Sequence, residues 1–129
     1  MLTIEQIQDN LVLMANTIET FNSIDVTKTI DYLGEIVSLQ STATETQASA
    51  KYHLLQAINA ELDRQAKLLK KDDIAPSIKK MRADSMCADW HYIYEKCVRY
   101  STNISHTIDA VRTKISYLKQ EMENAKFTK

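Results

Sequence analysis

The scarcity of glycine and proline constrains the fold of this chain more than any other feature. Its 129 residues include one glycine, Gly34, and one proline, Pro76. Tight turns depend on these two residue types, because glycine tolerates positive φ and proline fixes φ near the value that many turns need. A sheet of short strands would need many such turns. The sequence therefore predicts an all-α fold of about three long helices in one domain, residues 1–129.

Hydrophobic spacing places the predicted helices. Apolar side chains recur at steps of three and four residues over about residues 3–22, 26–70 and 76–126. Thr3 and Gln6 form a capping box at the first start, and Asp25 suits the N-cap of the second helix. Residues 40–50 contain no large apolar side chain. Either one helix continues there on small residues or it breaks in two, and the lack of glycine and proline favours one helix.

A long apolar stripe marks the last predicted helix, which opens with Pro76 in its first turn. The stripe is too long to be buried against a short partner. We therefore expect an elongated bundle or a coiled-coil-like hairpin that forms a homo-oligomer through this seam. The seam consists of Trp90, Ile93, Cys97, Tyr100, Ile104, Ile108, Val111, Ile115 and Leu118.

Residues 84–97 also gather side chains that bind metals in other proteins. Asp84, Cys87, His91 and Glu95 follow at steps of three, four and four, so they share one helix face. They extend over about 16 Å of helix, too far to enclose one ion without ligands from elsewhere. A polar flank of the seam is the favoured interpretation, and no metal site is predicted. Cys87 and Cys97 lie about 15 Å apart in one helix, which excludes a disulfide between them.

Catalytic motifs are missing from the sequence. A single glycine provides neither a phosphate-binding loop nor a nucleophile elbow. We therefore predict that the chain is not an enzyme and has no cofactor and no small-molecule substrate. Neither a secretion signal nor a membrane-spanning stretch is recognisable. We expect a cytoplasmic protein with reduced thiols and no membrane contact.

The two halves of the chain carry opposite charges. Residues 1–63 contain nine acidic and two basic side chains, whereas residues 64–129 contain eight acidic and fourteen basic ones. Such asymmetry is a hint of nucleic-acid binding. It is equally compatible with halves that attract each other and lysines that are only solvated surface. The candidate nucleic-acid-binding residues form one group around the predicted turn and another on the last helix: Lys67, Lys70, Lys71, Lys79, Lys80, Arg82, and Arg112, Lys114, Lys119, Lys126.

Aromatic side chains near these groups add to the nucleic-acid hypothesis. Tyr92, Tyr94 and Tyr100 lie on the last predicted helix, and Phe127 follows near its end. Unpaired bases stack on exposed aromatic rings. The alternative is that the tyrosines belong to the seam or its flank.

The last predicted helix resembles that of the UvsY-type recombination mediators of tailed phages. The resemblance rests on Trp90 followed by Cys97, on the run Ile108-Asp109-Ala110-Val111-Arg112, and on the closing pair Lys126-Phe127, with an amphipathic run between them. Thr113 and Lys114 stand where the family tends to have a glycine soon after the arginine. The resemblance does not extend to the earlier helices.

The resemblance implies a ring-like oligomer that binds single-stranded DNA. Such a protein helps to load a recombinase onto strands covered by single-strand binding protein. Arg112, Lys114, Lys119 and Lys126 are then the DNA contacts by position, whereas the group around the turn rests on charge alone. The alternative hypothesis is a phage-type structural, adaptor or inhibitor protein. It would act through helix-mediated protein contacts without nucleic acid.

Overall fold

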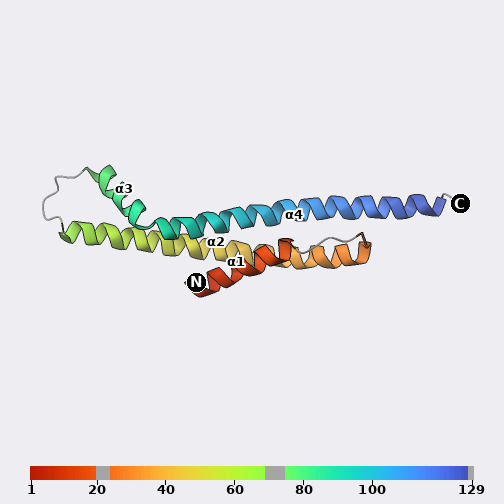
Figure 1. Ribbon diagram of the computed structural model, residues 1–129, viewed down its shortest axis with the longest axis horizontal. Coiled ribbons are helices and arrows are strands. Elements are labelled where there is room, and N and C mark those ends of the chain that lie inside the picture. The colour runs from red at the N-terminus through yellow and green to blue at the C-terminus, as the bar shows by residue number, and fades with distance from the viewer. Residues whose placement is uncertain (20–23, 69–74, 128–129) are drawn as a thin grey trace.

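The computed structural model describes residues 1–19, 24–68 and 75–127, and the helices in these ranges confirm the predicted all-helical fold. The described ranges contain four helices: α1 (Ile4–Glu19), α2 (Val26–Leu68), α3 (Pro76–Met86) and α4 (Ala88–Phe127). Figure 1 shows α2 and α4 side by side and antiparallel, α1 beside the middle of the pair, and α3 at one end. No helix in the described ranges is both long and apolar enough to cross a lipid bilayer.

The helix starts follow the signals in the sequence. At α1, the Thr3 N–H donates to Gln6 Oε1 at 2.9 Å and the Gln6 N–H donates to Thr3 Oγ1 at 3.2 Å, which is the predicted capping box. At α2, the Lys28 N–H donates to Asp25 Oδ1 at 3.0 Å. The predicted ends of the first two helices, at residues 22 and 70, lie outside the described residues.

Helix α2 continues without a break through residues 40–50. The small side chains there let other helices approach closely, since Ala43, Thr46, Ser49 and Ala50 are all buried. Two of them also bond to the N-terminal segment. Thr46 Oγ1 accepts a hydrogen bond from Asn10 Nδ2 at 3.1 Å, and Ser49 Oγ accepts one from the Leu2 N–H at the same distance. Small polar residues thus satisfy buried donors where α1 crosses α2.

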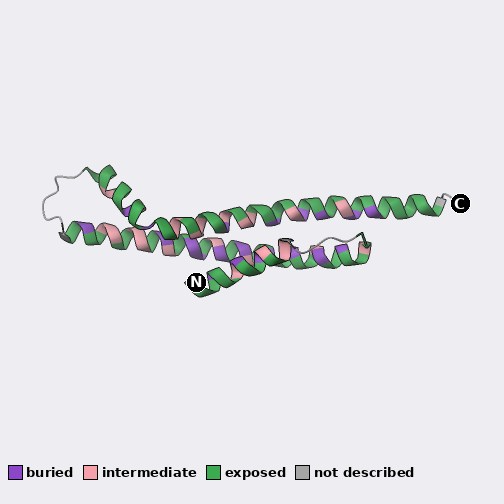
Figure 2. Ribbon diagram, viewed as in Figure 1, coloured by how far each residue is buried: buried purple, intermediate pink, exposed green. Residues whose placement is uncertain are grey.

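The apolar stripe of α4 is buried within the chain itself (Figure 2). The predicted seam faces α2 and α1 within the chain. Three members of the seam, Trp90, Ile93 and Tyr100, are half-buried. The buried members are Cys97, Ile104, Ile108, Val111, Ile115 and Leu118.

The helix predicted over residues 76–126 is divided at Cys87, and this is a correction to the sequence-based boundaries. Cys87 has φ −101° and ψ 23°, and its N–H donates to the carbonyl oxygens of Ala83 at 3.1 Å and Asp84 at 3.2 Å. The resulting bend directs α3 away from the line of α4 (Figure 1). Ala83 and Cys87 are both buried, and α3 contacts α2. Tertiary packing thus sets the break, which no glycine or proline marks.

Candidate nucleic-acid interface

The four side chains considered as metal ligands do not share one helix, because Asp84 lies in α3, Cys87 at the break, and His91 and Glu95 in α4. His91 Nε2 lies 3.4 Å from Asp84 Oδ1, Cys87 is buried and Glu95 is exposed. Burial raises the pKa of the Cys87 thiol, and the Glu61 and Asp84 carboxylates raise it further, which disfavours the thiolate that a metal needs. Among the described residues, no three histidine, cysteine or acidic side chains are close enough to hold an ion.

Trp90 of α4 contacts His53 of α2, which in turn bonds to the start of the chain. Its ring stacks on the His53 ring, with centroids 5.1 Å apart and an interplanar angle of 15°. His53 Nε2 lies 2.8 Å from the Leu2 carbonyl oxygen, and because that oxygen only accepts, Nε2 carries the proton. The start of the chain, α2 and α4 are therefore connected at this point.

The two predicted basic groups lie toward opposite ends of the molecule (Figure 1). Lys67, Lys80 and Arg82 are exposed near the α3 end, Lys79 there is half-buried, and Lys70 and Lys71 lie outside the described residues. On α4, Arg112, Lys119 and Lys126 are exposed and Lys114 is half-buried. The seven-residue spacing of the exposed three aligns them in one stripe. The structure does not bring the two groups into one site.

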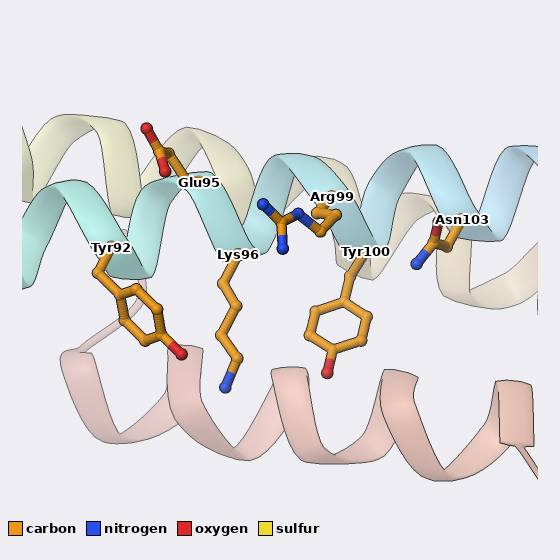
Figure 3. A pocket seen from close by; sticks show the side chains of 6 residues that line it. All are labelled: Tyr92, Glu95, Lys96, Arg99, Tyr100 and Asn103. Atoms are coloured by element: carbon orange, nitrogen blue, oxygen red, sulfur yellow. The ribbon is translucent and has the colours of Figure 1, made fainter.

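A groove on α4 beside α1 combines aromatic and cationic side chains, and we call it the tyrosine groove. Its volume is about 210 Å³, and it is lined by Tyr92, Glu95, Lys96, Arg99, Tyr100 and Asn103. In Figure 3 the side chains of Tyr92, Lys96 and Tyr100 point from α4 toward α1. The groove thus lies on the surface where two helices meet.

The two tyrosines of this groove are in different environments. Tyr92 is 64% exposed, and Lys96 Nζ lies 5.6 Å from the centre of its ring, a cation–π contact. Tyr100 is half-buried and packs against the core. Tyr94, the third tyrosine in the sequence hypothesis, also packs against the core. Of these three rings, Tyr92 is therefore the most available to a ligand, whereas the Tyr100 ring is held in place by its packing against the core.

Lys96, Arg99 and Asn103 were not among the residues predicted from charge. They follow Tyr92 at steps of four, three and four, so one helix face carries all four residues. That spacing was visible in the sequence. The position of α1 beside this face was not visible in the sequence, because no local signal sets where a separate helix packs along α4.

Comparison with known proteins adds no relative. None of the family models, curated proteins or solved structures compared with the chain matches it.

Proposed function

We propose that this protein binds single-stranded DNA through the tyrosine groove, without enzymatic activity. The observation that carries the proposal is the exposed Tyr92 ring beside Lys96 and Arg99 on one face of α4. Proteins that bind single strands combine aromatic rings for stacking with cations that follow the backbone. Both elements are present in this groove.

The chemistry of each side chain suits one part of a nucleotide. Stacking of a base on an aromatic ring contributes about 1–3 kcal/mol, measured by alanine substitution, and does not depend on sequence. Lysine and arginine neutralise phosphates and release condensed counterions.

The proposed role of this binding is that of a recombination mediator. The resemblance of residues 90–127 to UvsY-type proteins supports it, and the partners would then be a recombinase and a single-strand binding protein. The protein would act in the cytoplasm, host cytoplasm if phage-encoded, where the buried thiols of Cys87 and Cys97 stay reduced.

Fluorescence anisotropy of a labelled oligo-dT strand tests the proposal. The wild-type chain should bind at low salt, and Tyr92→Ala should weaken binding by about tenfold or more. Tyr117→Ala is the matched control, because Tyr117 is a tyrosine of α4 that is 61% exposed and lies outside the groove. It should bind like wild type. Absence of binding at low salt, or equal losses in both variants, would refute the proposal.

A structural, adaptor or inhibitor protein is the second candidate, and the surface of α1 favours it. This helix carries the exposed Glu5 and Asp9 and no lysine or arginine, and its Val12 and Leu13 are 60% and 50% exposed. An acidic helix with exposed apolar side chains suits a basic protein partner. This function predicts that the chain is indifferent to oligo-dT, so the same anisotropy measurement separates the two candidates.

A further inference from the structure

A second groove lies at the end of the molecule where α2 begins, and we call it the end groove. Its volume is about 450 Å³, and its lining is Ile24, Asp25, Val26, Thr27, Leu118, Glu121, Met122 and Ala125. Ile24 is 86% exposed and Met122 is 54% exposed. Among the described residues, the lining itself includes the carboxylates of Asp25 and Glu121 and no cationic side chain, whereas the exposed Lys119 and Lys126 of α4 lie outside it. The groove is therefore apolar with two acidic side chains in its lining.

The end groove exists because α4 is offset along α2 and extends past its start (Figure 1). The start of α2 lies beside residues 118–125 of α4, and α4 continues past it (Figure 1). Helix α1 covers only the middle of the α2–α4 pair. The last turns of α4 therefore lack the third helix that buries the apolar side chains of the middle. Residues 118–127 form a shelf about 15 Å long.

Helix α3, at the opposite end, has the complementary character. Its Ile78, Met81 and Met86 are 46%, 70% and 66% exposed, and Ala83 is its only fully buried residue. Lys80 and Arg82 on the same helix are exposed cations. The helix has 11 residues, a length of about 16 Å. An isolated helix this short is marginal in water, so an added partner stabilises it.

We propose that α3 of one copy docks into the end groove of a second copy. The two surfaces match in length, both expose large apolar side chains, and the cations of α3 meet the carboxylates of the groove. The contact joins different surfaces of identical chains, so a pair of copies keeps an unused groove on one copy and an unused α3 on the other. Such a head-to-tail contact builds a ring if the rotation closes and a filament if it does not. The proposal does not depend on nucleic-acid binding.

Light scattering on size-exclusion fractions, with one variant for each surface, tests the docking. Met81→Asp places a charge on the exposed face of α3, and Met122→Asp places one in the end groove. Both side chains are more than half exposed, so the fold should persist, and circular dichroism checks it. The wild-type mass should exceed that of one chain and rise with concentration. Each variant alone should be monomeric.

Mixing the two variants gives the decisive result. Met81→Asp retains an intact end groove and Met122→Asp retains an intact α3, so the mixture should form a heterodimer and nothing larger. Val12→Asp is the control, because Val12 is 60% exposed on α1 and belongs to neither surface; it should assemble like wild type. A monomeric wild-type chain, a variant that still assembles alone, or a mixture that stays monomeric would overturn the proposal. Oligo-dT binding by the monomeric Met81→Asp variant is measured in a separate experiment, and its result bears only on the tyrosine groove.

Discussion

The middle of the molecule and the end where α2 begins are built from the same two long helices, yet they expose different chemistry. In the middle α1 lies beside α2 and α4, and Ile36 and Ile104 have no exposed surface. At the end, Ile24 and Met122 are 86% and 54% exposed. A pair of helices buries one stripe on each, whereas a third helix covers the flanks as well. Stability therefore resides in the middle, and the end retains surface for contact.

Truncation of a side chain should show the largest difference between the two regions. Ile104→Ala should lower the free energy of unfolding by about 2–5 kcal/mol, because it removes buried methyl groups and leaves a cavity. Met122→Ala, a comparable change at the end, should cost less than about 1 kcal/mol, because its side chain is already half exposed. Urea denaturation of both variants measures the difference. Similar losses would show that the end is as much part of the core as the middle.

High pH should weaken the middle selectively. Burial raises the pKa of the Cys97 thiol from its ordinary value of 9.0 to about 11. The folded state holds this proton more tightly than the unfolded state. The protonated thiol therefore contributes fully to the free energy of unfolding below about pH 9, and this contribution is lost as the pH rises toward about 11. Once the pH exceeds about 11, the lost free energy of unfolding is about 3 kcal/mol.

The matched variant for this pH effect is Cys97→Ala. It removes the titrating thiol, so its free energy of unfolding should fall less steeply than that of wild type between about pH 8 and about pH 10.5. Urea denaturation at both pH values gives the two slopes. Equal slopes would mean that Cys97 is not held in a desolvated core.

At Gly34, in the part of α2 toward the end groove, we expect a substitution to raise the free energy of unfolding, by less than the losses predicted above for Ile104→Ala and for the Cys97 thiol. A β-carbon at this position would meet no atom within 4 Å, and the residue lies within the helix. Gly34→Ala should therefore stabilise the chain by about 1 kcal/mol, mainly because alanine loses less backbone entropy on folding. Thermal denaturation measures the gain. A lower melting temperature would show that another surface packs closely against Gly34.

The sequence predicts the helices well because their signals are local. Gly34 and Pro76 are the only residues of their types, and the capping residues Thr3 and Asp25 lie where the first two helices begin. The break at Cys87 is not predicted from the sequence, because α3, with its buried Ala83, packs against α2, a contact between distant parts of the chain. Local propensity carries no information about such a contact.

The candidate site was only partly predictable for the same reason. The aromatic half of the tyrosine groove was named from the sequence, since Tyr92 and Tyr100 are visible as a pair on one helix. Its cationic half was missed, because Lys96 and Arg99 belong to no basic run. Their importance appears only once Tyr92 and α1 are placed beside them. Contact between copies through the seam of α4 stays a prediction, because periodicity shows that a face is buried but not which helix covers it.

The salt dependence of oligo-dT binding tests the central proposal most directly. Each phosphate neutralised on a single strand contributes about 0.7 to the slope of log K against log salt. Replacing Lys96 and Arg99 together by glutamine should therefore make the slope shallower by about 1.4, whereas Lys28→Gln, an exposed lysine on α2 away from the groove, should leave it unchanged. A slope that is the same in all three proteins, or no binding by the wild-type chain at low salt, would contradict a nucleic-acid interface in the tyrosine groove.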